Sequence, residues 1–419
     1  QWHRLIFFLS IIGPGIITAN VDNDAAGITT YSVAGAHFGY ALLWPFVPII
    51  FALFVIQEMT SRMAVVTGKG LADLIREQFG VKATFYAMIV LVLANFGNVM
   101  AEFSGIAACA DLFNIPRFLL VVGAALLVWV LVVKGNYKTV EKVFLGACLF
   151  YFAYILSGFI TKPNWGMVAR ETFRPQFSWN QAYLVMLIGI VGTTIAPWMQ
   201  FYQQAAVVEK GIKLKDYNYH RMDVILGSIV VNVVAFFIIV VCAGTLFKGG
   251  LRVETVKDAA LALKPLAGEY AYLLFAFGLL NASLFAASIL PLSTAYSVCE
   301  GMGWESGVNK TFKQAPQFYS LYTGIISLGA FLVLIPRVPL VKIMLFSQVA
   351  NGILLPFVLI LMLRRVNNPR RRGEHVNSRF YNAIAWLTVI VMISLSLLLL
   401  YFTVLPRGGT LTFRGDVLY

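Results

Sequence analysis

Charged side chains are scarce in this 419-residue sequence, where Asp, Glu, Lys and Arg together make up 12% of the residues. A soluble protein of this length would carry roughly 100 charged residues, about 25% of its length, whereas this chain has 19 acidic and 32 basic residues. The hydrophobic residues reach 59%, and the mean hydropathy is +0.80. These values exclude soluble, secreted and disordered proteins and predict an integral membrane protein that lies mainly in the lipid bilayer.

Histidine and cysteine are also rare, at four residues each. The cysteines lie in or at the end of apolar stretches without C-x-x-C spacing, so we interpret them as buried thiols and not as metal ligands. The histidines are expected in termini or loops, at His3, His37, His220 and His375. The membrane interior is therefore expected to hold no imidazole for metal binding or proton transfer.

Long apolar stretches dominate what is present. Eleven segments contain about 20 mainly apolar residues and are long enough to cross a bilayer. No long polar linker separates them, so we expect an all-α integral membrane protein with a single transmembrane domain over residues 1–419. The expected spans are 5–36, 41–64, 84–113, 117–133, 138–161, 180–208, 222–247, 269–299, 317–335, 339–363 and 380–404.

The net charge of +13 is explained by topology. With the N-terminus in the cytoplasm, 20 of the 32 Lys and Arg residues fall on the cytoplasmic side and 12 on the other. This bias predicts a multi-pass protein of the cell membrane with an extracytoplasmic C-terminus. The arginine run at 370–372 is interpreted as a topology anchor in preference to a nucleic-acid or anionic-lipid patch. Residues 70–80 are expected to form an amphipathic helix on the cytoplasmic surface. We expect no nucleic-acid partner and no obligate protein partner.

Two segments contain residues that are atypical of a lipid-facing helix. The first includes Asp22, Asn23 and Asp24, and the small residues 25–27 that follow would permit unwinding. In the sixth, Pro197 removes a backbone donor and is expected to release carbonyl groups in the preceding turn. Released backbone groups are tolerated at membrane depth only where they line a cavity or are buried in protein.

Interruptions in the first and sixth segments predict two inverted five-helix repeats whose broken helices form a substrate site. The repeats are expected at about 5–161 and 180–363, with an appended helix at about 380–404. Two helix kinks in a scaffold are the alternative, which the position of Asp24 in the first interruption disfavours.

A carboxylate at such an interruption indicates a cation site, because the freed carbonyls and helix C-terminal ends are also negative. Asp22 and Asp24 cannot share one face of a regular helix, and Asp24 is the better candidate because small residues follow it. Carboxylate, carbonyl, hydroxyl and water oxygens favour Mg²⁺, Ca²⁺ or Mn²⁺ over Zn²⁺ or Cu²⁺. For Glu102, deep in the third segment, a structural hydrogen bond and a part in the ion path both stay open.

Five short motifs resemble the NRAMP family of divalent metal transporters, over roughly spans one to ten. They are GPG at 13–15, AGAHFGYALLW at 34–44, VVTGKGLADL at 65–74, AEFSGIA at 101–107 and SQVANGILLPF at 347–357. The resemblance implies a LeuT-like fold in which helices one and six are discontinuous and meet at a metal site.

The chain departs from the family pattern at the positions that the resemblance assigns to the metal. Where the family has Asp-Pro-Gly-Asn, this chain keeps the acid as Asp24 and has Gly27 in place of the Asn ligand. Where the family has Met-Pro-His, it has Ala196, Pro197 and Trp198. The thioether ligand that favours soft metals is therefore lost.

The positions that the resemblance links to proton transport differ too. Trp198 and Gln203 stand where the family has histidines, and Val99 stands where it has an Asp before Glu102. This pattern is similar to the NRAMP-related magnesium transporters. It implies a transporter mainly of Mg²⁺, and also of Mn²⁺, that binds a largely hydrated ion and works by alternating access without a cofactor.

Uptake of such an ion needs no proton coupling. A divalent cation that moves inward gains about 4.6 kcal/mol per 100 mV, twice the value of about 2.3 kcal/mol for a single charge. We therefore predict an uncoupled uniporter. The expected metal ligands are Asp24, Gly27, Thr193, Ala196 and Gln348, and the expected pocket or ion path contains Asn23, Pro197, Trp198, Gln203 and Glu102.

Gln348 resembles a family Gln that approaches the ion, and an interhelical hydrogen bond is its other interpretation. Three alternatives to the predicted function are a proton-coupled Mn²⁺/Fe²⁺ transporter, an amino-acid or amine transporter in which Asp24 pairs with an ammonium group, and an intramembrane aspartic protease. The protease is disfavoured because its two carboxylates must lie on facing helices, so the chain is not expected to be an enzyme.

Overall fold

The computed structural model of the chain describes residue 18 and residues 21–134, 151–367 and 376–404. In these ranges the regular structure is entirely helical. Seven helical segments are long and apolar enough to cross a membrane, and α6 (Arg117–Val133) is a shorter apolar helix. The all-α integral membrane fold predicted from the composition is thus confirmed. The division into two inverted repeats stays a prediction.

The helices of the first half follow the expected spans with one difference. The first and fifth spans are described only in their second parts, because 1–17, 19–20 and 135–150 lie outside the described residues. The expected surface helix at 70–80 and the third span follow each other without a loop, as two helices that meet at a kink at Gly80, where the backbone is not helical (φ 80°, ψ 172°). The elements are α3 (Ala25–Phe38), α4 (Phe46–Thr67), α5 (Leu71–Phe113), α6 (Arg117–Val133) and α8 (Phe152–Ile160).

The second half contains the interrupted sixth span, as α10 (Gln181–Thr194) and α11 (Pro197–Glu209). The remaining spans are single long helices, and a short helix between the fifth and sixth spans, α9 (Trp165–Phe173), was not anticipated. The others are α12 (Tyr217–Cys242), α13 (Val256–Ala260), α14 (Lys264–Ala267), α15 (Ala271–Met302), α16 (Pro316–Val333), α17 (Leu340–Val366) and α19 (Arg379–Val404).

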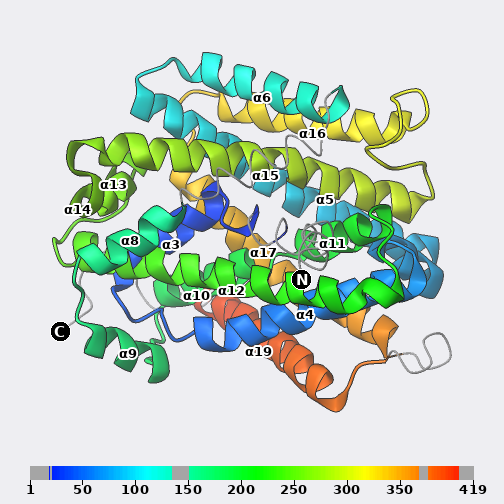
Figure 1. Ribbon diagram of the computed structural model, residues 1–419, viewed down its shortest axis with the longest axis horizontal. Helices are drawn as coiled ribbons and strands as arrows, with labels where there is room; N and C mark the ends of the chain where they lie inside the picture. The colour runs from blue at the N-terminus through cyan, green and yellow to red at the C-terminus, as the bar shows by residue number, and fades with distance from the viewer. Residues whose placement is uncertain (1–17, 19–20, 135–150, 368–375, 405–419) are drawn as a thin grey trace, which may run out of the picture.

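The helices pack in layers around a central group (Figure 1). Helices α3, α10 and α17 contact one another in the middle of the molecule. On one side α5 packs along α15, with α6 and α16 beyond them, and on the other side lie α4, α12 and α19. Large apolar side chains such as Phe118 on α6 and Leu387 on α19 are exposed, whereas Glu102 on α5 is buried. This distribution suits a protein surrounded by lipid.

Glycines bring α10 and α17 into backbone contact. A Cβ atom on Gly192 of α10 would lie 2.1 Å from the carbonyl oxygen of Gln348. A Cβ on Gly352 of α17 would lie 2.6 Å from the carbonyl oxygen of Ile188. Small residues permit such close helix approach inside membranes. The contact places Gln348 beside the last turn of α10.

Candidate metal site between two helix interruptions

The first interruption lies at Asn23 and Asp24. Residues 21 and 22 are helical, and α3 begins at Ala25 with Asp24 as its N-cap in an extended conformation (φ −71°, ψ −177°). The Asp24 Oδ1 atom accepts a 2.6 Å hydrogen bond from the Gly27 backbone N–H. Residues 25–27, where the sequence suggested unwinding, are therefore helical. An acidic N-cap stabilises a helix start, which explains why the chain unwinds before the small residues and not within them.

Two other helices hold the ends of this interruption. The Tyr151 hydroxyl donates a 2.7 Å hydrogen bond to the carbonyl oxygen of Asn23. The Ala25 backbone N–H donates to Glu102 Oε2 at 3.2 Å. Glu102 thus makes the structural hydrogen bond that was one of its two interpretations. Its second carboxylate oxygen is buried with no hydrogen-bond partner among the described residues, and its part in an ion path stays a prediction.

The second interruption lies at Ile195 and Ala196, as the position of Pro197 predicted. Ile195 (φ −127°, ψ 61°) ends α10, and Ala196 (φ −70°, ψ 140°) precedes Pro197, the first residue of α11. Proline suits that first position because its missing N–H would have no helical partner. The Ala196 carbonyl accepts 3.2 Å hydrogen bonds from the Gln200 side-chain amide and from the Met199 backbone N–H. A metal ion at this carbonyl would share it with both donors.

The two interruptions face each other. The Tyr31 hydroxyl on α3 lies 2.8 Å from the Thr194 hydroxyl on α10. A Cβ atom on Gly27 would lie 3.1 Å from Thr193 Oγ1 and 3.3 Å from Asp24 Oδ1. Asp24 is only 4% exposed and Thr193 only 2%. Three of the five expected ligand residues, Asp24, Gly27 and Thr193, are therefore together in a buried site. Because α3 is helical from Ala25, Gly27 contributes its backbone N–H, which orients the Asp24 carboxylate.

Gln348 lies next to this site through its backbone contact with Gly192. Its side-chain oxygen accepts a 3.0 Å hydrogen bond from Asn351 of the same helix. Asn351 in turn exchanges hydrogen bonds with Asn98 of α5 at 2.9 and 3.1 Å. Asn351 therefore makes the interhelical bond that was one interpretation of Gln348. The direct approach of Gln348 to an ion stays a prediction.

Besides Pro197, two expected path residues lie on α11, and their surroundings differ. The Trp198 side chain is 2% exposed, and its backbone carbonyl accepts a 3.1 Å hydrogen bond from the Ser293 hydroxyl. The Gln203 amide donates to the Ser61 hydroxyl of α4 at 2.5 Å. Because Gln203 lies six residues from Pro197, about 9 Å along a helix, the structure places it at α4 and not at the interruption. Its role in the path stays a prediction.

Sequence reasoning missed two hydroxyl groups that frame the site, at Tyr31 and Tyr151. A Tyr inside an apolar segment gives no signal of its own, because such residues are common in membrane helices. Asp22 was set aside, yet both of its carboxylate oxygens are buried without a hydrogen-bond partner among the described residues. In the same part of the chain, no three His, Cys, Asp or Glu side chains converge on one point.

His220 corrects the expectation that every histidine lies in a loop or terminus. It lies in α12, is fully buried, and its Nδ1 atom is 3.5 Å from the Asp223 carboxylate. The expected seventh span began at residue 222, and the helix extends five residues further toward the N-terminus. The polar run before residue 222 hid this extension. His37 also lies in a helix, in the last turn of α3.

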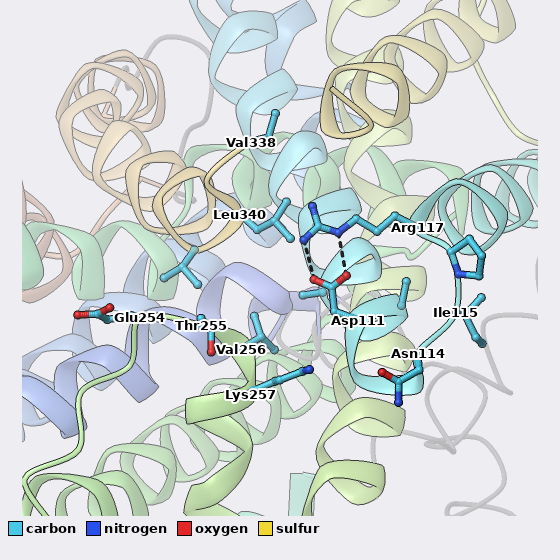
Figure 2. A pocket seen from close by; sticks show the side chains of 14 residues that line it. Asp111, Asn114, Ile115, Arg117, Glu254, Thr255, Val256, Lys257, Val338 and Leu340 are labelled. Atoms are coloured by element: carbon cyan, nitrogen blue, oxygen red, sulfur yellow. Dashed lines mark hydrogen bonds and ion pairs between the residues drawn. The ribbon is translucent and has the colours of Figure 1, made fainter. Parts of the chain in front are cut away.

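A pocket of about 720 Å³ opens at one end of α5 (Figure 2). Its wall includes Asp111 and Arg117, joined by two hydrogen bonds of 2.8 and 2.7 Å. Glu254 and Lys257 line it from the segment before and within α13, and Leu340 lines it from the start of α17. In the predicted orientation this end is extracytoplasmic. None of the expected site residues lines the pocket.

This architecture defines a class: multi-pass membrane proteins in which two interrupted helices meet at a buried polar site. The chain belongs to the Nramp family, described as natural resistance-associated macrophage protein-like, which it matches over residues 15–402. Family membership, expected from the motifs, is thus confirmed.

Two similar proteins match this chain over nearly their whole length. The chain is 25% identical to the divalent metal cation transporter MntH of Bacillus subtilis (strain 168) over 403 residues, which cover 94% of this chain and 92% of the relative. It is 27% identical to the MntH of Erwinia tasmaniensis over 395 residues, which cover 92% and 93% of the two chains.

Solved structures share the fold. A crystal structure of the Eremococcus coleocola manganese transporter, in complex with an aromatic bis-isothiourea substituted compound, matches with a TM-score of 0.76 and 21% identity over 96% of this chain and 89% of that one. A nucleobase-cation-symport-1 family transporter in a closed conformation matches with a TM-score of 0.60 and 12% identity over 95% and 94% of the two chains. The LeuT-like fold expected from the resemblance is therefore confirmed.

Proposed function

We propose that this protein is a membrane transporter of divalent cations, mainly Mg²⁺ and also Mn²⁺, and not an enzyme. The observation that carries the proposal is the buried Asp24 carboxylate, held at one helix interruption and facing Thr193 at the other. A carboxylate in the membrane interior is costly and marks a functional site. Matches to transporters named for divalent metal cations over more than 90% of their lengths support this class of substrate.

The preference for Mg²⁺ rests on the chemistry of the donors. Asp24, Thr193 and the backbone at Ala196 offer oxygen atoms, which hard cations prefer. Ala196 stands where the family motif has Met, so the interruption itself supplies no sulfur ligand. Mg²⁺ dehydrates reluctantly and keeps several waters in most protein sites. We infer that the ion is bound largely hydrated, as in the NRAMP-related magnesium transporters.

Transport is proposed to proceed by alternating access without protons. The membrane potential alone supplies about 4.6 kcal/mol per 100 mV for a divalent ion. Gln203, which stands at a family histidine position, is hydrogen-bonded to Ser61 and has no titrating group. Trp198 fills space beside α15, to which its carbonyl is bonded through Ser293. Neither residue can carry a proton at neutral pH.

The pocket at the end of α5 is the proposed entry. Ala108 on its wall lies six residues from Glu102, about 9 Å along the helix. Glu102 in turn contacts the first interruption through Ala25. One helix therefore connects the expected extracytoplasmic surface with the site. We also propose that the N-terminus is cytoplasmic and the C-terminus extracytoplasmic.

The test is uptake into proteoliposomes with simultaneous reporters of internal Mg²⁺ and internal pH, under an imposed inside-negative potential. The wild-type protein is expected to take up Mg²⁺ in a saturable manner without internal acidification, and Mn²⁺ is expected to compete. Acidification that follows influx would contradict the uncoupled mechanism. Absence of divalent uptake, with binding of amino acids in calorimetry, would overturn the substrate class.

A further inference from the structure

Asp22 is the second acidic residue at the first interruption, and it differs from Asp24 in its surroundings. Its side chain is 2% exposed, and neither carboxylate oxygen has a hydrogen-bond partner among the described residues. The Asp24 carboxylate, in contrast, caps α3 through the Gly27 N–H. A buried carboxylate without a partner is unfavourable unless a positive group or a donor compensates it.

Among the residues that the structure describes, the neighbours of Asp22 include no such positive group. The charged side chain that acts on Asp22 within the described part of the chain is the like-charged Asp24. The Tyr31 hydroxyl, which is also within electrostatic range of Asp22, is 2.8 Å from the Thr194 hydroxyl. Two buried carboxylates close to each other can both be charged only where a cation compensates them. The local charge is complementary to a divalent ion.

The backbone geometry also places Asp22 at the proposed site. A Cβ atom on Gly27 would lie 2.6 Å from the Asp22 carbonyl oxygen and 3.1 Å from Thr193 Oγ1. The backbone of Asp22 therefore lies beside Gly27, at the point where Thr193 of the second interruption approaches α3. The objection that residues two apart face opposite sides holds only for a regular helix. Here the helix stops between them, since Asn23 and Asp24 are not helical.

We infer that Asp22 is the second carboxylate of the cation site and binds the ion through water in its hydration shell. This inference rests on the proposed function and adds to it a charge-balanced pair, Asp22 and Asp24, for one hydrated divalent cation. A second carboxylate favours a divalent ion such as Mg²⁺ or Mn²⁺ over a monovalent cation or an ammonium group, because it offers the ion a second negative charge beside Asp24.

The test measures Mn²⁺ binding by calorimetry on the purified full-length protein and Mg²⁺ uptake in proteoliposomes. The variants are Asp22→Asn, Asp22→Glu and Asp24→Asn. Glu300→Gln is the matched control, because Glu300 also has a buried, unpartnered carboxylate oxygen but lies beside Gly70 at the far end of α15. Asp22→Asn is expected to weaken Mn²⁺ binding about 10- to 100-fold, the range for groups that act on a metal through one of its direct ligands, here a water molecule.

Charge retention separates a role in binding from a role in folding. Asp22→Glu is expected to recover most of the affinity lost in Asp22→Asn, and Glu300→Gln is expected to bind as the wild type does. If Asp22→Asn folds and binds Mn²⁺ within about twofold of the wild type, the inference is overturned while the proposed function stands. If Asp22→Asn does not fold, Asp22→Glu decides: Mn²⁺ affinity close to that of the wild type supports the inference, and a loss of more than about 10-fold in a folded Asp22→Glu protein contradicts it. A wild-type protein that binds no divalent ion contradicts the proposed function itself.

Discussion

The two helix interruptions perform different tasks at one site. The first is acidic, and side chains from other helices hold it, since Tyr151 binds the Asn23 carbonyl and Glu102 binds the Ala25 N–H. The second carries no charge and is formed by Pro197 and the extended Ala196. One interruption therefore supplies the charge, whereas the other supplies neutral oxygen atoms and sets the geometry of the backbone beside them. Changes at the first should affect binding, and changes at the second should affect geometry.

The largest expected effect is at Asp24. Asp24→Asn should reduce Mg²⁺ uptake by roughly 100-fold or more, because it removes a ligand charge and not only a supporting group. Asn is as good an N-cap as Asp, so α3 should keep its start and the protein should elute as the wild type does in size-exclusion chromatography. Uptake above a tenth of the wild-type rate would remove Asp24 from the site.

A packing change beside the second interruption should come next. Gly192→Ala would place a Cβ atom 2.1 Å from the Gln348 carbonyl, whereas Gly189→Ala in the same helix would meet Val349 at an ordinary 3.6 Å. Overpacking of this kind costs about 1–3 kcal/mol. Gly192→Ala should therefore unfold at lower temperature and transport slowly, and Gly189→Ala should match the wild type in both assays. Equal behaviour of the two variants would argue against the close contact of α10 and α17.

A smaller effect is expected from the bond that joins the two interruptions. Tyr31→Phe removes the hydroxyl that contacts Thr194, and such a bond contributes about 1 kcal/mol. Uptake should fall by about fivefold, the factor for that energy. Tyr322→Phe, which removes another buried hydroxyl on α16, is the control. Identical uptake rates in the two variants would show that the Tyr31 bond does not couple the interruptions.

The smallest effect is expected at the outer pocket. The Asp111–Arg117 pair is about two-fifths exposed on both side chains, and exposed ion pairs contribute about 0–1 kcal/mol. Arg117→Gln should leave the melting temperature nearly unchanged and alter the KM for Mg²⁺ by at most about fivefold. A complete loss of uptake in this variant would indicate that the essential cation site lies in the pocket and not between the interruptions.

The length and hydrophobicity of the segments predicted the helices well where an apolar run was uninterrupted and had clear boundaries. The fourth span was predicted at 117–133 and is observed as Arg117–Val133, because Pro116 and Lys134 bound an unbroken apolar run. The direct connection of the helix at 70–80 to the third span was not predicted, because the sequence does not show that the next helix begins immediately after Gly80. The amphipathic helix α9 was missed because it is too short and too polar to resemble a span.

The site was predictable in its chemistry but not in its local geometry. Asp24, Thr193 and Pro197 could be selected because charge and proline are rare inside spans. The start of α3 at Ala25 depended on the N-cap bond to Gly27, which is a three-dimensional feature. Asp22 was set aside by a rule for regular helices, and the helix is interrupted at Asn23 and Asp24, directly after it. The partners of Glu102 and Gln203 lie on other helices and leave no pattern in the local sequence.

The position of a bound ion tests most directly whether the cation site lies between the two interruptions at Asp24. Crystals of the wild-type protein grown with MnCl₂ allow anomalous scattering to locate Mn²⁺. We expect one anomalous peak between the two interruptions, with Asp24 as a direct ligand and Asp22 reached through water. A peak at Asp111 in the outer pocket with none near Asp24, at Mn²⁺ concentrations that saturate uptake, would contradict it.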